Sequence, residues 1–190
     1  MADVTCPPTL DHLVVAARTL DEGGAWIESL LGVAPVPGGK HDTMGTHNRL
    51  LALGGPAYLE VIAIDPEAPA PSRPRWFSLD TPGMQERLAR GPALIHWVVR
   101  TEALEDEVRR SREPLEVVAF SRGPYRWRMG LPADGRLPGD GHLPTMIQWE
   151  GSAHPAASLP PSGCELLELV TAGSAPRARI RAPVGVRWLE

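Results

Sequence analysis

Hydrophobic and polar residues alternate along several short stretches of the chain, most clearly at residues 11–17, Asp-His-Leu-Val-Val-Ala-Ala. Successive side chains of a strand point to opposite faces, so this pattern predicts a strand with His12 and Val14 on one face. The pattern returns at residues 95–99, Ile-His-Trp-Val-Val. We therefore expect two strands of the same kind.

The second stretch lies at a constant offset from the first. His96 follows His12 by 84 residues, and at the same offset Val14 matches Val98 and Leu20 matches Leu104. A match that continues without a gap is the signature of an internal repeat. We infer two copies of one structural unit.

Helix and turn signals predict the order of secondary-structure elements in the first unit. Thr19 and Glu22 form a capping box, which predicts a helix beginning after Thr19, and Gly32 is well placed to end it. Two strands, at residues 49–53 and 58–64, follow around a glycine-containing turn and indicate a hairpin. The unit therefore reads as strand, helix, then two or three strands.

Proline-rich passages divide the rest of the chain. We predict a first module at residues 9–65, a proline-rich connection at 66–92, a second module at 93–150 and a C-terminal extension at 151–190 packed on the second module. The extension contains one predicted strand at 165–170 and a short edge strand at 187–189.

Composition narrows the class of protein. The chain of 190 residues is 43% hydrophobic and 22% charged, as in ordinary soluble proteins, and its net charge of −4 argues against a nucleic-acid partner. We expect no signal peptide and no membrane span. Cys6 and Cys164 lack metal-type spacing and indicate reduced thiols. A cytoplasmic monomer or homodimer that binds a small molecule is the simplest interpretation.

Polar residues inside the apolar strands are candidates for chemistry. Glu60 and His12 are each the polar residue of a strand face, and the repeat adds His96 and, in a late strand, Gln148. A buried carboxylate needs a cation or a hydrogen-bond network, and imidazole and carboxylate groups bind Zn, Ni, Mn or Fe. The two pairs predict a four-ligand metal site between the modules, unless each side chain is simply hydrogen-bonded or solvent-facing.

The identity of the fourth ligand is undecided, because the glutamine at position 148 is a weaker ligand than a carboxylate. Glu150 is one substitute and Glu168 a more distant one.

A polar loop before the third strand contains His41, His47 and Asn48. These residues either line a substrate pocket or form the local hydrogen bonds of a turn. Arg126 alternates with aromatic residues and either receives an anionic substrate or is exposed.

Several segments together resemble the glyoxalase-like branch of the vicinal oxygen chelate superfamily, which includes glyoxalases, bleomycin-resistance proteins and extradiol dioxygenases. They are residues 11–15, 38–41, 45–50, 58–62 and 145–149. The resemblance implies an α+β fold in which two paired βαβββ modules form a curled mixed sheet around a cleft, with extra C-terminal strands.

The same resemblance implies a divalent metal in the cleft that chelates adjacent substrate oxygens and acts as a Lewis acid. By position, His12, Glu60, His96 and Gln148 match the ligands, and Glu60 is also a candidate base. The leading hypothesis is a metal-dependent lyase, isomerase or dioxygenase. The alternatives are a metal-free binding or sequestering protein, and a purely structural duplication in which Glu60 pairs with an arginine such as Arg49. Convergence of the four predicted ligands within about 4 Å of one point would favour the metal-dependent enzyme over these two alternatives.

Overall fold

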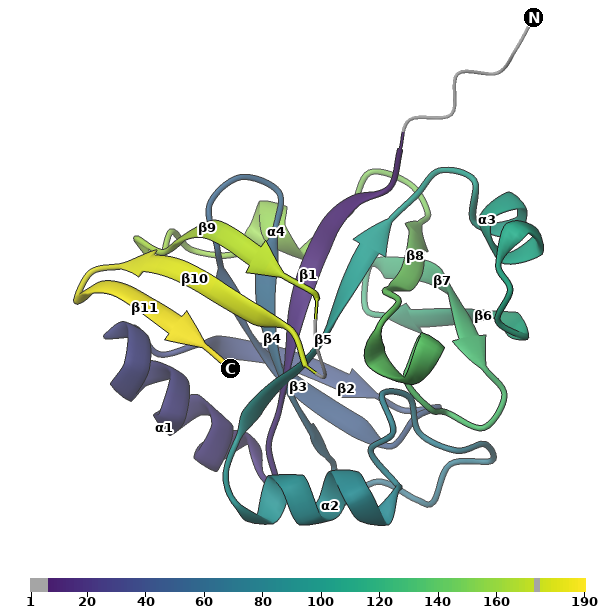
Figure 1. The fold of residues 1–190 in the computed structure, drawn as a ribbon, viewed down its shortest axis with the longest axis horizontal. Coiled ribbons are helices and arrows are strands. Elements are labelled where there is room, and N and C mark those ends of the chain that lie inside the picture. The colour runs from purple at the N-terminus through teal and green to yellow at the C-terminus, as the bar shows by residue number, and fades with distance from the viewer. Residues whose placement is uncertain (1–6, 173–174) are drawn as a thin grey trace, which may run out of the picture.

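The computed structural model describes residues 7–172 and 175–190, and it contains the two predicted modules (Figure 1). The first consists of β1 (Thr9–Ala16), α1 (Leu20–Leu31), β2 (Val36–His41), β3 (Thr46–Ala52) and β4 (Tyr58–Ile64). The second consists of β5 (Ala93–Arg100), α3 (Leu104–Arg110), β6 (Leu115–Arg122), β7 (Tyr125–Pro132) and β8 (Thr145–Trp149). The connection carries α2 (Pro82–Ala89), and the 3-10 turn η1 (Pro138–Gly141) precedes β8.

The modules share one sheet of eight strands in the order β2-β3-β4-β1-β5-β8-β7-β6. The central strands β1 and β5 run antiparallel, and each pairs on its other side with the last strand of its own module, in parallel. The sequence repeat is thus a repeat of topology. The predicted α+β fold with two βαβββ modules in a curled mixed sheet is confirmed.

The curl of the sheet brings its two edge strands together. Arg122, at the end of β6, donates from Nη1 to Nε2 of His41 at the end of β2, at 3.0 Å. Residues 81 positions apart in the chain are therefore neighbours. This contact helps to enclose a cleft on the concave side of the sheet.

Alternation along the strands produces two apolar cores. Val14 and Ile62 face the concave side, where they pack with Trp76 of the inter-module connection. Leu13 and Leu59 face the convex side and pack on α1. The connection therefore contributes to the concave core, which also surrounds the cleft.

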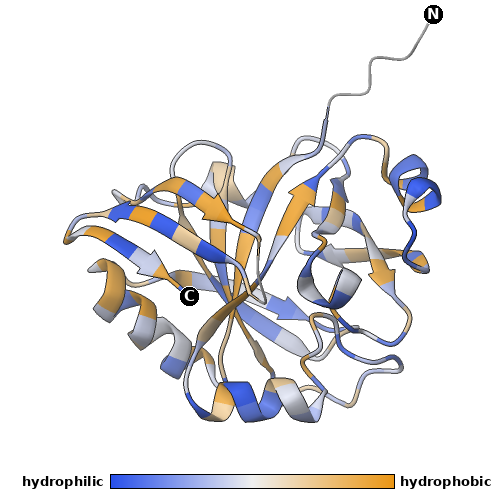
Figure 2. Ribbon diagram, viewed as in Figure 1, coloured by the Kyte–Doolittle hydropathy of each residue, from blue (hydrophilic) through white to orange (hydrophobic). Residues whose placement is uncertain are grey.

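The C-terminal extension forms α4 (Pro155–Ser158) and a second sheet of β9 (Glu165–Val170), β10 (Arg177–Ala182) and β11 (Gly185–Leu189). Hydrophobic and hydrophilic residues alternate along these strands in Figure 2. The predicted strands at 165–170 and 187–189 are present, and β10 was not predicted.

The extension packs on both modules and not on the second alone: Leu94 of β5 donates its backbone N–H to Glu190 at 3.1 Å, and the first module also contributes to the contact surface. Ala178 and Ile180 pack in the convex core beside residues of α1, and Leu166 donates its backbone N–H to Leu53 of the first module at 3.0 Å. The convex face of the first module offers an apolar surface on both the sheet and α1, which the extension covers. Cys164 is buried there, whereas Cys6 lies outside the described residues.

Helix α1 begins and ends as its sequence predicts. The Thr19 side chain accepts the backbone N–H of Glu22 at 3.1 Å, and Gly32 ends the helix in the left-handed region with φ of 75°. None of the helices among the described residues is long and apolar enough to cross a membrane.

Gly23 has a low intrinsic helix propensity, but the close packing of α1 on the sheet requires a glycine at this position. A Cβ built on Gly23 would lie 2.5 Å from Cγ1 of Val61 and 2.8 Å from Cβ of Ala17. The helix can approach the sheet this closely only because the side chain is absent.

We predict that Gly23→Ala destabilises the protein although alanine favours a helix by about 1 kcal/mol. Overpacking against Val61 costs roughly 1–3 kcal/mol and should dominate. Gly83→Ala in α2 is the matched control, because a Cβ there meets no atom within 4 Å. Urea unfolding should show a lower free energy of unfolding for the first variant and an unchanged or higher one for the second. A stabilised Gly23→Ala would contradict the packing argument.

Candidate active site

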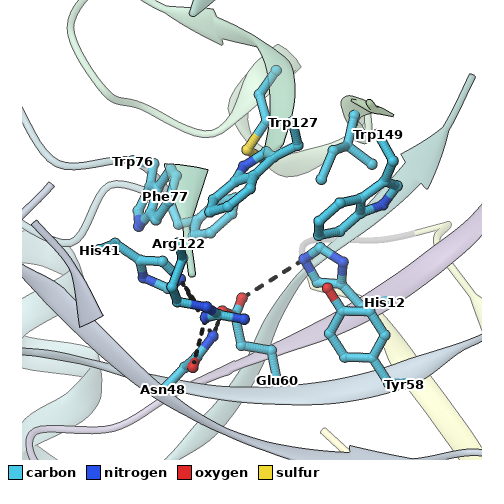
Figure 3. A pocket seen from close by; sticks show the side chains of 12 residues that line it. His12, His41, Asn48, Tyr58, Glu60, Trp76, Phe77, Arg122, Trp127 and Trp149 are labelled. Carbon is cyan, nitrogen blue, oxygen red and sulfur yellow. Dashed lines mark hydrogen bonds and ion pairs between the residues drawn. The ribbon is translucent and has the colours of Figure 1, made fainter. Parts of the chain in front are cut away.

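The cleft contains a small cavity of about 30 Å³, enough for one or two water molecules (Figure 3). Four strands of the first module and three of the second contribute to its wall, together with the connection. The lining residues are His12, His41, Asn48, Tyr58, Glu60, Trp76, Phe77, Arg122, Trp127, Met129, Ile147 and Trp149. Of the sequence-predicted residues, His12, Glu60, His41 and Asn48 are brought together here.

His12 is held by the residue that precedes it. Nδ1 of His12 lies 2.7 Å from Oδ1 of Asp11, and both side chains are buried. An ionised carboxylate only accepts hydrogen bonds, so Nδ1 of His12 carries a proton, and Nε2 is the ring nitrogen that faces Glu60 in the cavity. The Tyr58 ring stacks on the imidazole, with centroids 4.7 Å apart, and fixes its plane.

Asp11 is a fully buried carboxylate with several cationic or N–H partners. Its Oδ2 accepts from Nε1 of Trp149 at 2.9 Å and from Nε2 of His154 at 3.0 Å, and Nε of Arg100 lies 3.7 Å away. Burial opposes ionisation, but the hydrogen bonds from His12 and His154 outweigh it and hold the pKa of Asp11 well below its ordinary value. Asp11 is therefore charged across the physiological pH range.

Glu60 faces His12 across the cavity. Its Oε2 lies 3.7 Å from Nε2 of His12, and its Oε1 accepts from Nδ2 of Asn48 at 2.6 Å. One carboxylate oxygen is thus fixed and the other is directed at the imidazole, as the dashed line in Figure 3 shows. The proposed pairing of Glu60 with Arg49 was wrong, because Arg49 forms its ion pair with Asp21.

His41 and Asn48 form the far wall of the cavity with Arg122. Nη1 of Arg122 donates to Nε2 of His41 and to Oδ1 of Asn48, both at 3.0 Å. Burial, and then the charge of Arg122, lower the pKa of His41 to about 3, so this imidazole is neutral at pH 7. Asn48 consequently connects Arg122 to Glu60.

The remaining walls are aromatic. Trp76, Phe77 and Trp127 come from the connection and from β7, and Trp149 stands beside the His12 end. Apolar walls exclude water and strengthen the electrostatic interactions of the few charged groups inside.

The second histidine of the repeat has a different environment. Nε2 of His96 accepts the backbone N–H of Thr145 at 3.0 Å and lies 2.9 Å from its hydroxyl. Burial, and then the nearby His12, lower the pKa of His96 to about 3. Its Nε2 lone pair is therefore used by the β8 backbone and does not face the cavity as a ligand.

The match of Glu60 to Gln148 was also wrong. In the sheet Glu60 lies opposite Val14, and the residue opposite the equivalent Val98 is Thr145. Gln148 lies on the other face of β8, where its Oε1 accepts the backbone N–H of Leu104 at 3.1 Å. It thereby satisfies an N-terminal N–H of α3, which has no other side-chain cap.

The donor set does not fit the predicted metal site. The two substitutes for the fourth ligand form ion pairs at the surface, Glu150 with Arg128 and Glu168 with Arg179. Among the residues that the structure describes, no group of three or more His, Cys, Asp or Glu side chains could hold a metal ion. Two donors, His12 and Glu60, are fewer than the three protein ligands of a catalytic zinc site.

Two of the predicted substrate-binding residues lie outside the cavity. His47 points to the opposite face of β3 from Asn48, because neighbouring strand residues alternate in direction. Arg126 lines an adjoining outer recess of about 440 Å³, which shares His41 and Trp127 with the cavity. The recess gives room for a molecule larger than the cavity itself.

Sequence reasoning missed Asp11, Tyr58, Arg122 and His154. Asp11 immediately precedes His12, which is the one local signal that could have identified it. Arg122 and His154 reach the site only through the curl of the sheet and the fold of the extension, and no sequence spacing indicates either contact.

Comparison with known proteins gives one family and several similar folds. A family model described as "Glyoxalase-like domain" matches residues 10–183. No curated protein matches the chain. Among solved structures, methylmalonyl-CoA epimerase from Mycobacterium tuberculosis is 24% identical with a TM-score of 0.46, over 78% of this chain and 91% of that one.

Two further structures are similar. A hypothetical protein from Staphylococcus aureus is 19% identical with a TM-score of 0.50, over 77% of this chain and 60% of that one. A Streptomyces coelicolor methylmalonyl-CoA epimerase in complex with 2-nitronate-propionyl-CoA is 16% identical with a TM-score of 0.46, over 77% of this chain and 96% of that one.

The buried histidines predict a pH dependence of stability. The pKa of His96 is lowered from 6.5 to about 3, so the unfolded chain takes up a proton that the folded protein does not. Stability is complete above pH 6.5 and falls as the pH drops towards 3, by at most about 1.4 kcal/mol per pH unit for each such histidine.

Denaturant unfolding between pH 4 and pH 6.5 should show a weaker pH dependence for His96→Gln than for the wild type. Asp and Glu residues, with ordinary pKa values of about 3.9 and 4.3, also titrate in the lower part of this interval, but they do so in both proteins, so the difference between the two slopes reports His96. His142→Gln, at an exposed loop position, is the control and should keep the wild-type slope. An unchanged slope in His96→Gln would show that His96 is not buried in its neutral form.

Proposed function

The chain belongs to the glyoxalase-like domain family, within the vicinal oxygen chelate superfamily as its sequence resemblance predicted, and on that premise we propose that it is a proton-transferring enzyme. Its substrate would be a small molecule with a carbonyl group and an adjacent oxygen. Of the three reaction types expected from the sequence, the geometry supports an isomerase best. The observation that carries the proposal is the 3.7 Å approach of Nε2 of His12 to Oε2 of Glu60 at the cavity.

The two groups have complementary roles in such a reaction. Glu60 accepts a proton from the carbon beside the carbonyl, and the electron pair moves to the carbonyl oxygen. The proton passes to Nε2 of His12, which returns it to the same carbon as the electron pair moves back from the carbonyl oxygen. General acid–base catalysis by positioned groups of this kind contributes roughly 10²–10⁴-fold to a rate.

Asp11 supports the reaction without touching the substrate. It holds the proton on Nδ1 of His12 at 2.7 Å, so that Nε2 is the acceptor. When Nε2 receives a proton, the buried negative charge of Asp11 stabilises the imidazolium. Asn48 plays the corresponding part for Glu60, because its amide fixes Oε1 and leaves Oε2 for the substrate.

Aromatic walls around few polar groups also suit a protein that only binds a small molecule. This second candidate, the sequestering protein, requires the same cavity but no proton transfer. It predicts that substitution of Glu60 leaves ligand affinity nearly unchanged and that the wild type catalyses no exchange.

Deuterium exchange separates the candidates. The wild type should accelerate exchange of the methyl protons of pyruvate, pyruvamide or hydroxyacetone in D₂O, followed by proton NMR. Glu60→Gln and His12→Gln should each lower this rate by at least about 100-fold, because one member of the relay is lost. The exposed His142→Gln should keep the wild-type rate.

Chelation by EDTA should leave the exchange rate unchanged. A rate that is lost with EDTA and restored by Zn, Ni, Mn or Fe would contradict the proposed proton relay, as would wild-type exchange that survives in both variants. Absence of exchange together with binding of the probes would favour the sequestering protein.

A further inference from the structure

Arg122 is the cation of the cavity, and it comes from the opposite edge of the sheet. It ends β6 and meets β2, where Nη1 donates to His41 and Asn48 at 3.0 Å. The guanidinium also lies 5.7 Å from the centroid of the Tyr125 ring. These contacts hold the side chain in place against the cavity wall.

The positive charge of Arg122 has only neutral acceptors. His41 is uncharged at pH 7, since burial lowers its pKa to about 3, and Asn48 is an amide. The two carboxylates of the site have other partners, Asp11 with His12 and Glu60 with Asn48. Within residues 7–172 and 175–190, no carboxylate approaches the Arg122 guanidinium to ion-pair distance.

The guanidinium has donors to spare. Its hydrogen bonds with the described residues all leave from Nη1, so Nε and Nη2, which form one edge of the guanidinium, donate to none of them. This edge has the fork geometry that binds a carboxylate through two parallel hydrogen bonds. Arg122 thus has neutral acceptors at Nη1 and two donors without a partner among the described residues, as a receptor for an anion requires.

The backbone of β2 is shaped to admit this arginine. A Cβ on Gly39 would lie 2.6 Å from Cδ of Arg122, and one on Gly38 would lie 2.1 Å from Oδ1 of Asn48. The Gly39 backbone N–H in turn donates to that Oδ1 at 2.9 Å. Two consecutive glycines therefore let the edge strand pass close to Arg122 and Asn48.

We propose that Arg122 binds a carboxylate of the substrate, so that the substrate class is a small 2-oxo or 2-hydroxy acid. The inference rests on the proposed function and deepens it. Arg122, Asn48, Glu60 and His12 follow one another around the cavity, joined by contacts of 3.0, 2.6 and 3.7 Å. The carboxylate would lie at the Arg122 end, beside the outer recess, and the reacting carbon at the Glu60 end.

Pyruvate and pyruvamide provide a matched pair of probes, because they share their heavy-atom skeleton and differ in charge. Their affinities can be measured from the fluorescence of the cavity tryptophans, and their exchange rates from NMR. The wild type should bind pyruvate at least about tenfold more tightly than pyruvamide. Arg122→Gln should abolish this preference by weakening pyruvate binding alone, and Arg122→Lys should restore part of it.

Arg18→Gln, on the exposed side of the pair with Glu22, is the control and should keep the wild-type preference. Circular dichroism and melting temperature establish that Arg122→Gln is folded. Equal binding of the two probes by the wild type would overturn the inference, as would a preference that survives in Arg122→Gln or disappears instead in Arg126→Gln.

The binding and exchange readouts separate the two proposals. Selective, Arg122-dependent binding of pyruvate without exchange would support the anion site and refute the proton-transfer function. Exchange of both probes at equal rates and affinities would support that function and refute the anion site.

Discussion

The buried charge of Asp11 is the constraint on which the site depends. A carboxylate removed from water costs several kcal/mol unless donors replace the lost hydration. Here the donors are His12 of β1, Trp149 of β8, and His154, which precedes α4. Satisfying one charge therefore ties the first module, the second module and the C-terminal extension together at the cavity.

The same interaction distinguishes the two histidines of the repeat. His12 follows an aspartate, which accepts a hydrogen bond from its Nδ1–H and leaves Nε2 towards the cavity. His96 follows Ile95, and its Nε2 accepts a backbone N–H from Thr145 instead. The duplicated topology is intact, but only the first copy keeps an ionisable pair, because Thr145 stands where the first module has Glu60. A symmetric four-ligand site is incompatible with this division of roles.

Much of the fold follows from local signals. Alternation predicted the central strands, the capping box and Gly32 gave the limits of α1, and the repeat indicated the two modules. The failures arose where contacts depend on tertiary structure. Gln148 was matched to Glu60 by the likeness of its neighbours, whereas strand register selects Thr145, and register depends on the length of the loop before β8. Arg122 reaches His41 only because the sheet curls, and the extension covers the first module because an apolar face is available there.

The central claim is that Asp11 fixes His12 with an unprotonated Nε2 facing Glu60. The nitrogen chemical shifts of the His12 ring, assigned with the help of His12→Gln, report directly which nitrogen carries the proton. We predict a protonated Nδ1 and an unprotonated Nε2 in the wild type at neutral pH, with this difference weakened in Asp11→Asn. A wild-type ring with the proton on Nε2 and an unprotonated Nδ1 would contradict the account.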